Sequence, residues 1–285
     1  MADNSTAAPR RLPIDQFEGD GRKLTYFLDA WNDTRAAFGM WRAWTLLGWR
    51  DFRLQTSRTL LGSLWGVIGT TITVVVLGFV YGSMSQFGSY NAFVFLSAGF
   101  IAWFFISACI QGGASVFISA SGTLTERNIP IFFPILRYFF RIFIEFITKF
   151  ATYCIVCAVT MFNPGVNFFL IFVSLLIYVV NGIWVLAFFA IVGARFRDAI
   201  QIISPIMLIV FLATPILWPE ASLISNRVVL ALNPFTYFID ILRDPMLGRV
   251  PDVRDYVVTL SAAVVGWGLA GLAFARSKNR LVFWL

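Results

Sequence analysis

The chain has 285 residues, of which 59% are hydrophobic and only 13% are charged. Soluble globular domains carry about 25% charged residues and disordered chains have low hydrophobicity, so both classes are excluded. The net charge is +7, and in so apolar a chain we interpret it as an orientation signal, because the cytoplasmic loops of membrane proteins collect Lys and Arg.

Two segments precede the first long apolar stretch. Residues 1–23 are polar and mixed in charge, and we expect them to form a flexible tail. Residues 24–60 are amphipathic and are expected to be helical. Arginines share one face of this helix and aromatic residues the neighbouring face: Arg35, Arg42, Arg50 and Arg53, then Phe38, Trp41, Trp44 and Phe52. This pattern is typical of a helix on an anionic membrane surface; a generic anchor and a helix that also positions a partner and a gate both fit it.

Six apolar stretches follow, each close to the roughly 20 residues that cross a hydrocarbon core as a helix. They are residues 61–81, 91–117, 138–162, 166–192, 199–218 and 256–275. They are too long and too uniformly apolar for the strands of a membrane barrel. Residues 61–285 are therefore predicted to form an all-α membrane domain with six transmembrane helices.

The loops between these stretches alternate in charge. Nine Lys and Arg precede the first stretch, whereas residues 82–90 and 163–165 contain neither. The sequence thus predicts that both termini are cytoplasmic. Residues 219–255 are expected to face outward, and their short apolar pieces, broken at Asn233-Pro234, suggest short re-entrant or interfacial helices between crossings five and six.

Charged residues recur every four positions at the start of the third stretch: Arg137, Arg141, Glu145 and Lys149. Charges in a crossing helix usually face protein or water and mark a pathway. Because Arg matches phosphate geometry in a bidentate fashion, one hypothesis is a basic vestibule for an anionic headgroup, a phosphate ester or diphosphate. The alternative is a set of self-paired charges at the cytoplasmic interface.

Aromatic residues are abundant, with 31 Phe, 10 Trp and 8 Tyr. Most are expected to pack or to face lipid, but flat rings with polar edges also line paths for sugars. The candidates for such an aromatic conduit are Trp65, Tyr81, Trp103, Phe104 and Phe105.

The sequence lacks the residues that some metal sites and nucleotide-binding sites require. The chain contains no His and no Gly-Lys pair, so it cannot build a His-based metal site or the phosphate loop of an ATPase. We expect no metal, no cofactor and no nucleic-acid partner. The pair Cys154 and Cys157 lies in an apolar run and is interpreted as packing or lipid-facing.

Four motifs in order resemble one family. They are Arg-Thr-Leu-Leu-Gly-Ser-Leu-Trp at 58–65, Ala-Gly-Phe-Ile-Ala-Trp-Phe-Phe at 98–105, Ala-Arg-Phe-Arg-Asp at 194–198 with Ala-Thr-Pro-Ile-Leu at 213–217, and Leu-Asn-Pro-Phe at 232–235 with Leu-Arg-Asp at 242–244. The chain is similar to the membrane subunit of type-2 ABC exporters of O-antigen, teichoic acid and capsule.

The resemblance implies a homodimer in the bacterial inner membrane, served by two copies of a separate ABC ATPase that binds ATP and Mg. It implies transport of a polyprenyl-diphosphate-linked glycan. The entrance would combine the charged ribbon with Arg50, Arg53, Arg58, Leu61 and Gly62. A coupling helix within residues 119–134 would dock on the ATPase through Thr123, Leu124, Thr125, Glu126 and Arg127. The spacing of Thr123 and Glu126 fits a capping box, which predicts a helix start there.

Two alternatives remain open at this point. A drug or small-lipid efflux permease would have the same fold. A membrane-embedded transferase acting on a lipid-linked sugar would need catalytic acids, and the cluster available is Asp240, Asp244, Asp252 and Asp255.

Overall fold

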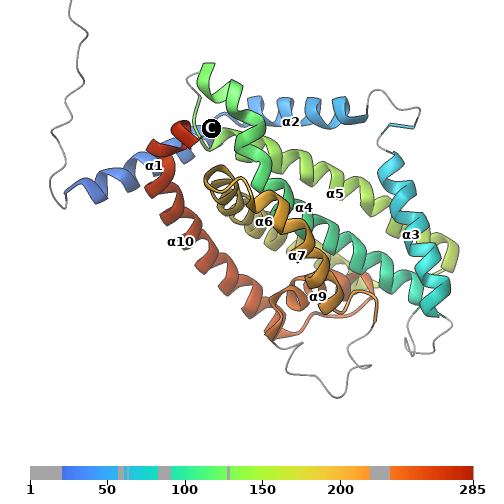
Figure 1. Ribbon diagram of the computed structural model, residues 1–285. Coiled ribbons are helices and arrows are strands. Elements are labelled where there is room, and N and C mark those ends of the chain that lie inside the picture. Colours follow the sequence, from blue (N-terminus) through green and yellow to red (C-terminus); the bar gives the residue numbers. More distant parts are fainter. Residues whose placement is uncertain are drawn as a thin grey trace, which may run out of the picture.

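The computed structural model describes residues 21–56, 61–62, 64–82, 91–126, 129–218 and 232–284. Within these ranges the chain forms nine α-helices and one short 3-10 helix, with no residue in a β-strand (Figure 1). The helices are α1 Gly21–Gly39, α2 Trp41–Thr56, α3 Leu64–Gly82, α4 Ala92–Glu126, α5 Phe133–Thr160, η1 Val166–Leu170, α6 Ile171–Arg195, α7 Ala199–Ala213, α9 Pro234–Met246 and α10 Val253–Trp284. The predicted all-α class is confirmed.

Five helical stretches among the described residues are long and apolar enough to cross a membrane: α3, α4, α5, η1 with α6, and α10. The stretch at 199–218 is shorter than predicted, because α7 ends at Ala213 after 15 residues. At 1.5 Å per residue α7 is about 22 Å long, less than the ~30 Å hydrocarbon core. The apolar run continues past the end of α7 into a turn. Ile216 of this turn is buried inside the protein, so this part of the run packs against protein and does not extend the helix.

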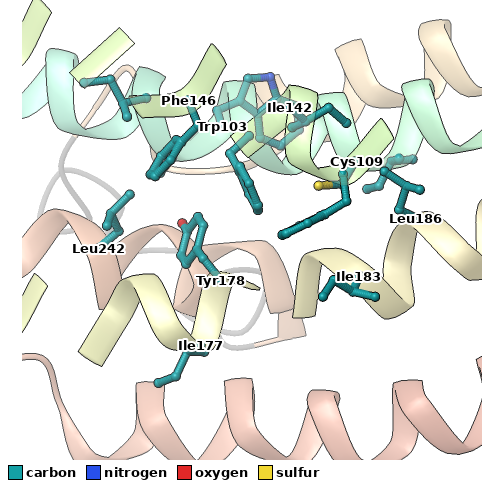
Figure 2. Close-up of a cluster of buried hydrophobic side chains, with 14 of the residues drawn as sticks. Trp103, Cys109, Ile142, Phe146, Ile177, Tyr178, Ile183, Leu186 and Leu242 are labelled. Atoms are coloured by element: carbon teal, nitrogen blue, oxygen red, sulfur yellow. The ribbon is translucent and has the colours of Figure 1, made fainter. Parts of the chain in front are cut away.

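Helix α4 lies at the centre of the bundle and packs against α3, α5, α6, α7 and α9 (Figure 1). In the most apolar 18-residue segment of α4, 78% of the segment is buried, whereas the corresponding share for α3 is 22%. The core around α4 continues between α5 and α6. There, Phe146 of α5 stacks on Tyr178 of α6, with ring centroids 6.0 Å apart (Figure 2). One helix is thus surrounded by protein while α3 stays at the periphery.

The amphipathic segment is two helices, because the chain turns at Met40 between α1 and α2. Because of this break, α1 and α2 do not continue one helical face, and the aromatic residues that were predicted to share a face lie in different environments. Trp41 is exposed, Phe52 is buried and Trp44 is half-buried. The arginines on the predicted charged face are all exposed: Arg35, Arg42, Arg50 and Arg53.

At one end of the bundle, α1 joins two distant parts of the chain. The carboxylate of Asp33 accepts hydrogen bonds from the backbone amides of Ile131 and Phe132, at 3.1 and 3.0 Å, just before α5 begins. Lys278 of α10 lies 3.6 Å from the same carboxylate. The N-terminal helices, the α4–α5 connection and the end of α10 therefore share one end of the molecule (Figure 1).

The other end holds α9, a short helix packed against α4, α6, α10 and η1. Asn233 begins it, with its side-chain oxygen accepting from the Phe235 amide at 3.0 Å. The hydroxyls of Tyr153 and Tyr178 donate to α9 carbonyls, each at 2.6 Å. The predicted break at Asn233-Pro234 and the short helix after it are confirmed.

Candidate functional site

The charged ribbon of α5 lies against α2. Arg137 donates to both carboxylate oxygens of Asp51, from Nε and from Nη2, at 2.6 Å each. The two side chains are 30% and 27% exposed, so this pair is bidentate but open to solvent on one side. Asp51 was not among the residues predicted for the site. It lies 86 positions away from Arg137, and its role depends on how α2 packs.

The close approach of α2 to α5 depends on Gly48. A Cβ at this position would lie 2.8 Å from the backbone oxygen of Arg137 and 3.0 Å from the ring of Phe140. Trp44, one turn earlier on α2, meets the same Phe140 ring edge-on, with centroids 5.8 Å apart. A residue without a side chain therefore sets the distance at which Asp51 reaches Arg137.

Arg141, one turn along α5, is held only loosely. Its Nη1 is 3.4 Å from Gln55 Oε1, its Nε is 3.8 Å from Glu145 Oε1, and its guanidinium lies over the Tyr138 ring. Both Arg141 Nε and Glu145 Oε1 are buried and have no hydrogen-bond partner among the described residues. A buried polar group without a partner costs about 1–3 kcal/mol, so Arg141 is suited to bind a further acceptor.

A cavity of about 420 Å³ opens between α2, α4 and α5. Its polar lining comes from all three helices: Asp51, Ser115, Ser119, Arg137, Tyr138 and Arg141. A cavity of this size is in the range that holds small molecules or headgroups. The two guanidinium groups against one carboxylate favour an anionic occupant.

A second polar stripe, missed by the sequence analysis, follows α4 at the same spacing of four: Ser107, Gln111, Ser115 and Ser119. Ser204 of α7 donates to Gln111 Oε1 at 2.9 Å, and Gln111 Nε2 in turn donates to Ser107. The spacing of polar residues within an apolar helix was the available signal. Because Ser115 and Ser119 also line the cavity, the stripes of α4 and α5 meet there.

The ribbon continues to Lys149, whose Nζ lies 4.6 Å from the centre of the Phe104 ring. Phe104 is half-buried. Trp103 and Phe105, by contrast, are only 6% and 3% exposed and pack within the core. These two rings are covered by their own chain, and the assignment of the aromatic residues to a conduit stays a prediction.

The remaining predicted residues are dispersed. Trp65 is exposed in the first turn of α3, and Tyr81 is half-buried near its other end. Leu61 and Gly62 form a turn before α3, in which Gly62 has the positive φ of 55° that glycine tolerates. Arg50 and Arg53 lie on the exposed face of α2, outside the cavity lining, and Arg58 lies outside the described residues.

The capping-box prediction was wrong. Helix α4 continues to Glu126, so Thr123, Leu124 and Thr125 lie in its last turns instead of starting a new helix. A four-residue motif carries less weight than the long apolar helix into which it falls. Arg127 lies outside the described residues, and docking of this region on an ATPase stays a prediction.

Two acids of the predicted outward cluster are engaged in the fold. Asp240 forms an ion pair with Arg243, whose Nη1 donates to the Pro215 carbonyl. Asp255 accepts a hydrogen bond from the Asp252 amide at 2.9 Å and is buried at the start of α10. These contacts hold α9 and α10 in place and give no support to a catalytic pair.

Comparison with known proteins adds two findings. The family described as "ABC-2 type transporter" matches residues 42–247, a range that runs from the beginning of α2 to just beyond α9. The "O-antigen export system permease protein RfbA" of Myxococcus xanthus is 21% identical over 235 residues, which cover 81% of this chain and 90% of that protein.

Proposed function

The chain belongs to the ABC-2 type transporter family, and we propose that it is the transmembrane subunit of an ATP-driven exporter of a polyprenyl-diphosphate-linked polysaccharide. The substrate would move from the cytoplasmic to the outer side of the bacterial inner membrane. The similarity to an O-antigen export permease over most of the chain supports the substrate class.

The observation that carries this proposal is the meeting of two polar stripes in one cavity. Polar side chains inside a membrane-crossing helix are expensive unless they face protein or water. The α5 stripe supplies Arg137 and Arg141 to the cavity, a chemistry suited to a diphosphate. The α4 stripe leads from Ser119 to Gln111, and its hydroxyls and amide suit the hydroxyl groups of a sugar.

We infer six crossings with both termini in the cytoplasm. Helix α7 would complete the fifth crossing together with the buried turn after Ala213. The end that carries α1, α2 and the end of α10 would be cytoplasmic, because the basic residues before α3 gather there. Exposed aromatic side chains of α1 and α2, such as Trp31 and Trp41, would lie at the headgroup level of the membrane.

The functional unit would be a homodimer with two copies of an ABC ATPase, which bind ATP and Mg. A second copy would pack on α3 and α7, where Ile72 and Phe79 of α3 and Ile209 of α7 are each more than half exposed. The ATPase would dock at residues 119–134, where α4 ends and Asp33 holds the approach to α5. Closure of the ATPases on ATP would then move α4 and α5 together.

Export in cells tests the proposal. A strain lacking this gene is complemented with the wild-type chain, and surface polysaccharide is measured by glycan electrophoresis and lectin binding. We expect surface glycan to return only when the cognate ATPase is active. Return of glycan with an ATPase variant that cannot hydrolyse ATP would contradict the proposal.

Efflux of a small apolar molecule is the second candidate, and one observation favours it. An apolar cavity of about 230 Å³ lies between α4, α6, α9 and α10, lined by Phe105, Tyr178 and Trp184 among others. It is too small and too apolar for a glycan. The same deletion strain distinguishes the two: altered drug susceptibility with normal surface glycan would favour efflux.

A further inference from the structure

We propose that Asp51 is an internal competitor of the substrate: it holds Arg137 in the position that a phosphate group takes on binding, and its displacement releases α2 from α5. The inference rests on the proposed function, since it names how the entrance responds to its ligand. The ligand class is an organic diphosphate, read from the geometry of the two arginines.

The first step is the match between Asp51 and a phosphate. Arg137 presents Nε and Nη2 to the two oxygens of Asp51, and a guanidinium presents the same pair of donors to two oxygens of a phosphate. The pair borders the cavity and is about 30% exposed on its arginine side. An anion can therefore approach Arg137 from the cavity without unfolding either helix.

The second step concerns Arg141, which has an N–H donor, at Nε, that is available to a ligand. This residue is four positions from Arg137, so the two guanidinium groups extend from neighbouring positions on one face of α5. Arg141 Nε has no hydrogen-bond partner among the described residues, and Glu145 is too distant, at 3.8 Å, to provide one. A diphosphate carries more charge and more acceptors than the carboxylate of Asp51, and it would engage both arginines where Asp51 engages one.

The third step connects binding to movement. Among the described residues, side-chain hydrogen bonds join α2 to the charged face of α5 between Asp51 and Arg137 and between Gln55 and Arg141. Both end on the arginines that a diphosphate would take. The apolar contact of Trp44 with Phe140 lies at the other side of Gly48 and would remain. Binding would thus remove these polar contacts from the C-terminal half of α2, where the buried Phe52 remains as an apolar contact, and would leave the N-terminal half in place.

The energetic condition for such a switch is met by competition. A ligand shifts an equilibrium between two conformations only by its differential affinity for them. A phosphate on the Nε and Nη2 edge of Arg137 takes the donors that Asp51 uses, so a ligand bound at that edge favours the conformation in which α2 is released. ATP-driven transport would then start from a loaded entrance.

The test measures the α2–α5 distance in the complete transporter, reconstituted with its ATPase in lipid nanodiscs. Spin labels at Leu54 and Ile147, both exposed, report the distance by pulsed electron resonance after Cys109, Cys154 and Cys157 are replaced. Farnesyl diphosphate is the probe, inorganic diphosphate the headgroup alone, and farnesol the matched lipid without phosphate. We expect a longer distance with both diphosphates and no change with farnesol.

Variants separate the exchange from simple attraction. Asp51→Asn should lengthen the distance without ligand and bind farnesyl diphosphate about tenfold more tightly, while Asp198→Asn, on an exposed turn, should match the wild type. Arg137→Ala with Arg141→Ala should abolish binding. Binding by wild type without a change in distance would overturn the inference, as would an unchanged affinity in Asp51→Asn. Export in cells is measured separately, so failure of the inference is distinguishable from failure of the proposed function.

Discussion

Asp33 and Lys278 lie 3.6 Å apart, Nζ to Oδ1, and join α1 near the beginning of the described chain to α10 near its end. The same carboxylate accepts the two amides that precede α5. Three segments that are far apart in the sequence are therefore held by one side chain, at the end of the bundle where the partner ATPase is proposed to dock.

Replacing Asp33 with Ala should destabilise this junction. The loss removes the acceptor for the amides of Ile131 and Phe132, a change that resembles removal of a helix cap and costs about 1–2 kcal/mol. Thermal unfolding of the detergent-solubilised protein measures it. The matched control is Asp29→Ala, because Lys278 donates to the backbone oxygen of Asp29 and not to its side chain. Equal stability of the two variants would contradict the junction.

Gly48→Ala should push α2 away from α5. The added Cβ would lie 2.8 Å from the Arg137 oxygen, and overpacking of this kind costs roughly 1–3 kcal/mol. We expect reduced export and a longer α2–α5 distance. Gly39→Ala is the control, since nothing lies within 4 Å of its Cβ. A Gly48→Ala protein that exports normally at the wild-type distance would show that the close contact is dispensable.

Gln111→Leu and Ser204→Ala should each slow glycan export severalfold while the transporter still hydrolyses ATP. The amide of Gln111 bridges α4 and α7, with Oε1 accepting from Ser204 and Nε2 donating to Ser107. Under the proposed function, its remaining donor and acceptor would bond a passing sugar. Ser261→Ala serves as the control, because within the part of the chain that the structure describes this exposed hydroxyl bonds only to the Val258 carbonyl of its own helix. Rates of export and of ATP hydrolysis are measured on the same preparation. If Ser261→Ala has the same effect as Ser204→Ala, the stripe has no special part in transport.

Arg243→Ala should strongly destabilise the end of the bundle that holds α9. Arg243 is 4% exposed and pairs with Asp240, and removing one partner of a buried pair typically costs about 3–5 kcal/mol. Recovery of folded protein in size-exclusion chromatography reports the loss. The double variant Arg243→Ala, Asp240→Ala should recover part of it, because no unpaired carboxylate remains. A double variant less stable than the single one would refute this explanation.

The sequence predicted those features that depend on apolar length and on spacing along one helix. The crossings at α3 to α6 and α10, the break at Asn233-Pro234 and the shared face of Arg137 and Arg141 all belong to this class. It failed where tertiary packing decides. Ile216 is buried in a turn beyond the end of α7 and does not belong to a longer helix. Trp103 packs in the core of the chain.

The partner of Arg137 could not be predicted for the same reason. Asp51 lies on α2, and the turn at Met40 gives this helix an orientation that a single helix over residues 24–60 would not have. Its reach to α5 also requires the close approach at Gly48. Neither feature leaves a periodic pattern along the chain.

ATP-driven export of a glycan can be observed in vesicles that contain only the chain and its ATPase. The chain and its ATPase are reconstituted in liposomes with a lipid-linked polysaccharide on the face that binds ATP, and glycan on the opposite face is measured with a lectin. For an ATP-driven exporter, we expect glycan to become accessible only when ATP and Mg are added. Glycan that crosses without ATP, or that stays in place while ATP is hydrolysed, would contradict this expectation.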